Sequence, residues 1–154
     1  MELRERIQAD TKTAMKEKDS ARLSTLRLIS AAIKDREIAA RTENTEHPGL
    51  TEGDLIAILS RMVKQRQESA RAYEEGGRLE LAAKEEVEIE IIQGYLPRQL
   101  DEDEIRAAIA KVIDDLGATS VRDMGRVMAE LRGRYAGQMD FGIVGPMIKD
   151  KLMG

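Results

Sequence analysis

The chain of 154 residues contains no cysteine and no tryptophan, and it has only one histidine and three prolines. Without cysteine it can form neither a disulfide framework nor a thiolate metal site. Aromatic residues make up 3% of the chain, whereas charged residues make up 35%. Few prolines together with many Ala, Glu, Arg, Leu and Ile residues are typical of a helical protein. The composition therefore predicts an all-α fold.

Long apolar runs are also missing. No stretch approaches the ~20 residues that a membrane-spanning helix needs, and the opening sequence MELRERIQADTK is too charged for a secretory signal. We therefore expect a cytoplasmic protein without membrane contact. The formal net charge is −4 and the pI is about 5.2. A surface that binds nucleic acid would have to be a local basic patch.

Apolar residues recur at helical spacing along the N-terminal two thirds of the chain. The pattern predicts four helices there, over residues 1–17, 20–42, 51–75 and 78–95. A loop over 42–50 contains the single histidine, His47. No other metal-ligand residues stand near it at a suitable spacing, so we interpret His47 as an exposed loop residue.

The third and fourth of these helices are predicted to fold back on each other over Gly76-Gly77 as a long antiparallel hairpin. Arg66 falls near the centre of the apolar arc of the third helix, and Glu85 and Glu88 fall inside the arc of the fourth. A half-buried arginine needs a carboxylate, because an unpaired buried charge is costly. We expect Arg66 to pair with Glu88, or else Glu85, and to fix helix packing rather than perform catalysis.

Pro97 is predicted to end the fourth helix, because proline disfavours the helical conformation of the residue before it. The segment LPRQL, residues 96–100, would then link an N-terminal helical domain (1–97) to a small C-terminal three-helix domain (98–154). In the second domain, Asp101 and Glu104 are placed to form a capping box, and Gly117 should end the helix that they begin.

The next helix is expected to begin at Thr119 or Ser120. Gly125 is predicted to let another helix approach closely, and Pro146 should kink the last helix or delay its start. The apolar line of the helix after Ser120 would consist of Val121, Met124, Met128, Leu131 and Tyr135.

The electrostatic signal that we single out lies in residues 122–134. This segment contains four arginines and two acids, so its net charge is +2. The arginines are Arg122, Arg126, Arg132 and Arg134. Arginine suits phosphate because its guanidinium offers paired donors. No aromatic residues interleave, so contact with RNA would be made through backbone and shape rather than base stacking. The alternative interpretation is an ordinary solvated helix face.

Motifs for a catalytic site are missing. The sequence has no P-loop and no GxGxxG after a strand, and one histidine without cysteine leaves no conventional zinc site. We expect no cofactor and no metal. The acids Glu85, Glu86, Glu88 and Glu90 are interpreted as an arginine partner plus a solvated face.

Five stretches stand out as motifs: LRLISAAIKD (26–35), KQRQES (64–69), GGRLELAAKEEVEIEIIQGYLPRQL (76–100), SVRDMGRVMAEL (120–131) and GQMDFG (137–142). In their order and spacing they resemble the GatB/YqeY family over nearly the whole chain. The resemblance implies a small C-terminal helical domain shared with the tail of the B subunit of the tRNA-dependent amidotransferase. That enzyme converts Glu-tRNA(Gln) or Asp-tRNA(Asn) to the amide. Its tail contacts tRNA, while amide transfer and phosphorylation occur in other domains and another subunit.

One segment departs from the family pattern. The family usually has a basic residue after the glycine of the last motif, whereas this chain has Gln138-Met139. The departure favours residues 122–134 over the C-terminus as the phosphate-contacting surface.

The resemblance and the arginines together predict a non-catalytic helical module that binds tRNA or another structured RNA, with an aminoacyl-tRNA enzyme as a candidate partner. Two alternatives stay open. The family label implies a carbon–nitrogen ligase with glutamine as amido donor, although the residues supply no such site. A protein-interaction adaptor would instead use the hairpin or the Met-rich C-terminal helices as a groove for a partner helix.

Overall fold

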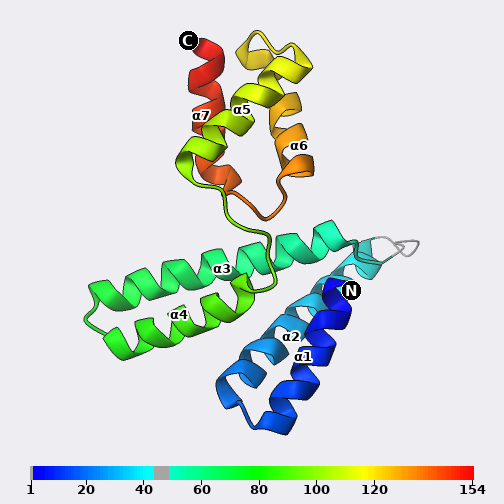
Figure 1. Cartoon of the computed structure of the whole chain (residues 1–154), viewed down its shortest axis with the longest axis vertical. Helices are drawn as coiled ribbons and strands as arrows, with labels where there is room; N and C mark the ends of the chain where they lie inside the picture. Colours follow the sequence, from blue (N-terminus) through cyan, green and yellow to red (C-terminus); the bar gives the residue numbers. More distant parts are fainter. Residues whose placement is uncertain (1, 44–48) are drawn as a thin grey trace. The chain divides into compact units, whose positions relative to one another are not determined.

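The structure is a computed structural model that describes residues 2–43 and 49–154 (Figure 1). The described residues form helices and contain no strand, so the predicted all-α fold is confirmed. His47 and most of the loop predicted around it lie outside the described residues. The helices are α1 (Leu3–Glu17), α2 (Ser20–Glu43), α3 (Glu52–Glu75), α4 (Leu79–Gln93), α5 (Glu102–Leu116), the short 3₁₀ helix η1 (Val121–Asp123), α6 (Met124–Arg134) and α7 (Phe141–Met153).

The chain divides into two compact units, Met1–Leu96 and Pro97–Gly154. The first unit contains α1 to α4 and the second contains η1 and α5 to α7. Each unit has a core of its own. Buried residues of the first core include Leu26, Ile29, Leu59, Ile89 and Ile92; those of the second include Val112, Val127, Leu131, Val144 and Ile148.

The long hairpin of the first unit is formed by α3 and α4, which run antiparallel side by side (Figure 1). A capping box begins α3: Thr51 Oγ1 accepts from the amide of Asp54 at 3.1 Å, and Asp54 Oδ2 accepts from the amide of Thr51 at 2.8 Å. The turn after α3 places Gly77 at a φ of 73°, which glycine adopts without strain. The predicted hairpin is therefore present.

The second unit starts its first helix with another capping box. Asp101 Oδ1 accepts from the amide of Glu104 at 2.8 Å, and Glu104 Oε1 accepts from the amide of Asp101 at 3.1 Å. Gly117 ends α5 in the left-handed conformation, with a φ of 63°. Both features were expected from local sequence, because each depends on residues at most four positions apart.

Two details of the second unit differ from expectation. The helix after Ser120 begins with the 3₁₀ turn η1, and Val127 rather than Val121 lies in the core. Among the described residues, a Cβ built on Gly125 would meet nothing within 4 Å, so none of the described helices approaches there. Gly125 lies about 120° around α6 from the buried Leu131, which turns it toward solvent. Of the two outcomes predicted for Pro146, the delayed start is not observed, because α7 begins at Phe141 with Pro146 inside it.

Candidate functional site

The four arginines singled out in the sequence all lie on η1 and α6 of the second unit. Arg122, Arg126 and Arg134 occur at four-residue intervals with Glu130 between the last two, so neighbouring members lie side by side and the arginines form a row along η1 and α6. Arg132 lies beside this row. All four residues are exposed. The structure thus brings them onto one unit, within a short stretch of surface that also contains acids.

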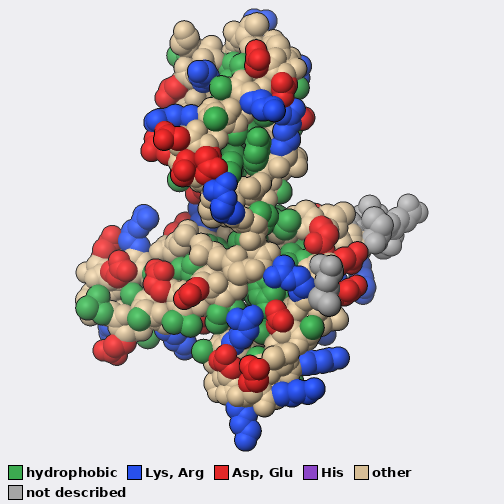
Figure 2. Space-filling model, viewed as in Figure 1, with side chains coloured by type: hydrophobic (Ala, Val, Ile, Leu, Met, Phe, Trp, Pro, Cys, Tyr) green, Lys and Arg blue, Asp and Glu red, His purple; other side chains and the backbone are tan. Residues whose placement is uncertain are grey.

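Acidic partners take up much of the charge of this arginine row. Arg126 pairs with Asp123 at 3.0 Å, and Arg134 pairs with both Asp115 and Glu130 at 2.8 Å. These two carboxylates raise the pKa of Arg134 above its usual value. Basic and acidic side chains are accordingly mixed over the face of the second unit that Figure 2 shows. The row is less positive than its sequence indicates.

The other two arginines have different surroundings. The guanidinium carbon of Arg132 lies 5.7 Å from the centre of the Phe141 ring, a cation–π contact. Arg122 has no ion-pair partner in the part of the chain that the structure describes. Of the four candidates, Arg122 is therefore the one whose charge is least compensated.

Asp123 links the arginine row to the start of the helix. Its Oδ2 atom accepts from the amides of Thr119 at 2.9 Å and Ser120 at 3.4 Å, while Oδ1 accepts from Arg126. The amide of Thr119 and the Arg126 guanidinium lower the pKa of Asp123, because both stabilise its ionised form. Asp123 therefore stays charged and holds Arg126 close to η1.

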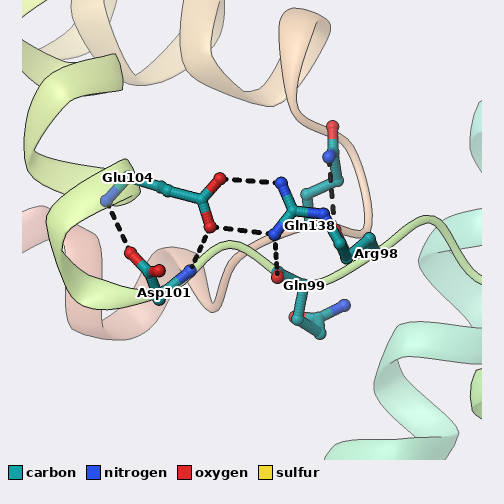
Figure 3. A network of polar contacts seen from close by, with 5 residues as sticks. All are labelled: Arg98, Gln99, Asp101, Glu104 and Gln138. Carbon is teal, nitrogen blue, oxygen red and sulfur yellow. Dashed lines mark hydrogen bonds and ion pairs between the residues drawn. The ribbon is translucent and has the colours of Figure 1, made fainter.

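A polar network ties the start of the second unit to the turn before α7 (Figure 3). Arg98 donates to Glu104 through two bonds of 2.8 and 2.7 Å, and Gln138 donates to the Arg98 carbonyl at 3.2 Å. The Gln99 side chain donates to the carbonyl of Gly137. Gln138 stands where the family usually has a basic residue. Its side chain contributes a hydrogen bond to the Arg98 carbonyl and no positive charge.

The predicted partners Arg66 and Glu88 meet between α3 and α4. Arg66 Nε donates to Glu88 Oε2 at 3.0 Å, and the two side chains are only 15% and 16% exposed. Arg66 also donates to the carbonyl of Met62 at 3.2 Å. Glu85 is half-buried one turn away, and among the described residues it forms no ion pair with Arg66. The pair lies inside the hairpin, where it joins the two helices.

A second polar cluster was not found from the sequence. The Tyr95 hydroxyl, just after α4, donates to Asp10 of α1 at 2.5 Å and accepts from Arg22 of α2 at 3.3 Å. The guanidinium carbon of Arg6 lies 5.1 Å from the centre of the Tyr95 ring. These residues line an open cavity of about 280 Å³. The cluster joins three helices of the first unit around one phenol.

The chemistry of this cluster suits structure better than acid–base catalysis. Burial and then the hydrogen bond to Asp10 raise the pKa of Tyr95 to about 12. A phenol with that pKa stays protonated near neutral pH, where a general acid or base would need to exchange its proton. In the sequence, Tyr95 belongs to the stretch 76–100 that resembles the family. Its partners lie 73 and 85 positions away, beyond the reach of helical spacing.

The described residues include neither a candidate metal site nor a helix fit to span a membrane. They contain no group of three or more His, Cys, Asp or Glu residues placed to hold a metal ion. None of the described helices is both long and apolar enough to cross a membrane.

The geometry defines a class of protein: an all-α chain of two compact units, built on a four-helix portion with a long hairpin and a smaller portion of three helices. The chain belongs to the YqeY-like protein family, whose model matches residues 4–152. The resemblance noted from the sequence motifs is thereby confirmed.

Several fungal proteins named "Altered inheritance of mitochondria protein 41, mitochondrial" are similar to the chain. The protein of Pyrenophora tritici-repentis is 30% identical over 135 residues, which cover 84% of this chain and 71% of the relative. That of Eremothecium gossypii is 36% identical over 90 residues, covering 58% and 46%. That of Meyerozyma guilliermondii is 28% identical over 148 residues, covering 92% and 74%. The chain thus spans about half to three quarters of these relatives.

Proposed function

We propose that the protein is a non-catalytic RNA-binding module, related to the tail of the tRNA-dependent amidotransferase B subunit, that contacts tRNA or another structured RNA through its second unit. The observation that carries the proposal is the exposed row of Arg122, Arg126 and Arg134 with Arg132 beside it. Guanidinium groups bind phosphate oxygens through paired donors. Family membership supports the proposal, because the family shares this unit with a tail that contacts tRNA.

The ion pairs of the arginine row determine how strongly it is expected to bind RNA. Arg126 and Arg134 are held by acids, so their positions are fixed before RNA arrives, but their net attraction for phosphate is reduced. We expect modest affinity that falls as salt rises, because bound phosphates release counterions. Aromatic stacking plays no part in the row, so the contact would read the backbone rather than the bases.

The test compares tRNA binding by three proteins at two salt concentrations. The variant Arg122→Glu with Arg126→Gln should weaken binding by about tenfold, equivalent to about 1.4 kcal/mol. The control Lys149→Glu with Lys151→Gln makes the same charge change on exposed residues of α7. Arg134 is left intact because its loss would free two carboxylates. Equal, negligible binding by all three proteins would reject the proposal.

Catalysis by the isolated protein has a direct test of its own. Incubation of the pure protein with Glu-tRNA, glutamine and ATP should leave the glutamyl ester unchanged. Formation of Gln-tRNA would overturn the non-catalytic assignment and favour the carbon–nitrogen ligase.

An adaptor is the second candidate function, and α4 is the feature that favours it. Leu79 and Val87 are 67% and 46% exposed, and the exposed Ala83 lies midway between them at helical spacing. Such a stripe is able to accept an apolar helix face. A stoichiometric protein partner that survives nuclease treatment and is lost in Leu79→Gln with Val87→Gln would favour the adaptor over RNA binding.

A further inference from the structure

Three basic residues recur at seven-residue intervals along α2: Arg27, Lys34 and Arg41. Seven residues are nearly two helical turns, so the three stay on one side of the helix and drift by only about 20° per step. The two ends of this α2 stripe are about 21 Å apart along the helix axis, at about 1.5 Å per residue. All three residues are exposed. The buried Leu26, Ile29 and Ile33 lie on the other side of α2.

No acid neutralises the α2 stripe among the described residues. Glu37 is the one acid at helical contact spacing, three positions after Lys34 and four before Arg41. Arg4 of α1 already holds Glu37 at 2.5 Å. The nearby Glu43 pairs with Arg36 at 3.7 Å. The remaining acid, Asp35, follows Lys34 directly and therefore points away around the helix by about 100°. Among residues 2–43 and 49–154, the three cations are left without an ion-pair partner.

This is the opposite of what happens on α6. There Arg126 and Arg134 engage three carboxylates between them, whereas here none of the three cations engages a carboxylate of the described residues. An exposed charge without a partner attracts a polyanion more strongly than one already in an ion pair. The α2 stripe is thus the less compensated of the two basic surfaces.

The residues around the stripe are small and polar. Ser24, Ser30 and Ala31 are exposed beside it, so a sugar–phosphate backbone can approach closely, and the serine hydroxyls can donate to phosphate oxygens. Among the described residues of α2, Ile38 is the one large apolar residue at helical contact spacing from the stripe, and the other exposed one, Leu28, lies about 100° around the helix from Arg27. A membrane-binding helix would need a wider apolar face. The surroundings therefore favour nucleic acid over a lipid surface.

We propose that the α2 stripe is a second RNA-binding surface, which contacts phosphates along an RNA backbone through Arg27, Lys34 and Arg41 without reading sequence. The proposal rests on the proposed function for its ligand, but it assigns the contact to the first unit of the chain. It predicts that each cation neutralises about one phosphate when RNA binds.

The experiment measures the salt dependence of tRNA binding by the full chain. Neutralising the stripe in Arg27→Gln/Lys34→Gln/Arg41→Gln should reduce the slope of log K against log salt by about 2–3, because each lost phosphate contact contributes about 0.7–0.9. Glutamine keeps good helix propensity, and circular dichroism checks that α2 remains folded. The control Arg61→Gln/Arg71→Gln/Arg78→Gln removes the same charge from exposed positions of α3 and the following turn and should leave the slope nearly unchanged.

The variants on α6 and α2 separate the two proposals. A slope that falls in the α2 variant, but not in the α3 control, supports the stripe. Equal slopes in these two variants, with binding lost only in Arg122→Glu/Arg126→Gln, would reject the stripe and leave the proposed function standing. No binding by the unaltered protein would reject both. Stripe-dependent binding to vesicles rich in phosphatidylserine, with an unchanged tRNA slope, would also overturn the RNA assignment.

Discussion

The Tyr95 hydroxyl is held between groups with opposite effects on its proton. It donates to the Asp10 carboxylate, which stabilises the neutral phenol, and it accepts from Arg22, which stabilises the phenolate. Tyr95 is only 5% exposed, and this burial also disfavours the charged phenolate. Burial and Asp10 together outweigh Arg22, so the pKa of Tyr95 rises to about 12.

This balance predicts an unusual tyrosine titration. In a Tyr73→Phe/Tyr135→Phe background, phenolate absorbance should rise with a midpoint near 12, and Asp10→Asn should lower the pKa toward 10. Because the folded pKa is raised, the stability that Tyr95 contributes is complete below pH ~10 and is lost as pH rises through about 12. A midpoint near 10 in the Tyr95-only protein would contradict this account.

The Glu104 carboxylate shows the reverse shift. The two hydrogen bonds from Arg98, followed by the amide of Asp101, lower the pKa of Glu104 to about 2. Its contribution to stability is therefore present above its unfolded pKa and disappears only as pH falls through about 2. In an NMR titration of side-chain carboxyls, Arg98→Gln should raise the pKa of Glu104. Arg106→Gln, which removes the partner of Glu102 instead, should leave it unchanged.

At the scale of helices, contacts between residues close together in the sequence could be predicted, whereas contacts between residues far apart in the sequence could not. The capping boxes at Thr51 and Asp101 depend on residues three positions apart, so they could be predicted. The approach of Arg66 and Glu88 could be anticipated because a tight turn joins their helices and fixes their phase. The contact between Tyr95 and Asp10 could not, since it arises only when α1 and α4 both pack against α2.

Charge compensation was the second feature that sequence counting missed. The pairing of Arg126 with Asp123 follows from helical spacing, but Arg134 also meets Asp115 of α5, nineteen positions away. Counting charge within residues 122–134 therefore overestimated the positive surface there. The same count overlooked α2. There Glu37 forms an ion pair with Arg4 of α1 and so does not compensate the charge of the α2 stripe.

The hairpin pair offers a test of how α3 and α4 hold together. Arg66→Met should lower the free energy of unfolding by about 1–3 kcal/mol, because Glu88 is left half-buried without a partner. The double variant Arg66→Met/Glu88→Met should lose less than the sum of the single changes, since no charge is then stranded. Urea unfolding measures all three.

Glu85→Gln is the matched control for the hairpin, and its effect should stay within about 0.5 kcal/mol. Additive losses from Arg66→Met and Glu88→Met would show that the pair does not couple the two helices. If Glu85→Gln lowered the free energy of unfolding as much as Glu88→Met, the assignment of Glu88 as the partner of Arg66 would be wrong.

At the scale of the whole chain, stability depends on two cores rather than one. Leu59 is fully buried in the first unit and Leu131 in the second, and the two clusters share no residue. A unit of about 60 residues buries a smaller fraction of its surface than one of about 100, so the second unit has less stability in reserve.

Truncating one core should therefore unfold one unit. Leu131→Ala should cost about 2–5 kcal/mol, enough to open Pro97–Gly154 while α1 to α4 stay folded. Hydrogen exchange would then become fast in α5, α6 and α7 only, whereas Leu59→Ala should speed exchange chiefly in the first unit. Faster exchange throughout the chain in Leu131→Ala would mean that the units fold as one. The α2 stripe and the arginine row of η1 and α6 belong to different units with separate cores, so each can be altered separately.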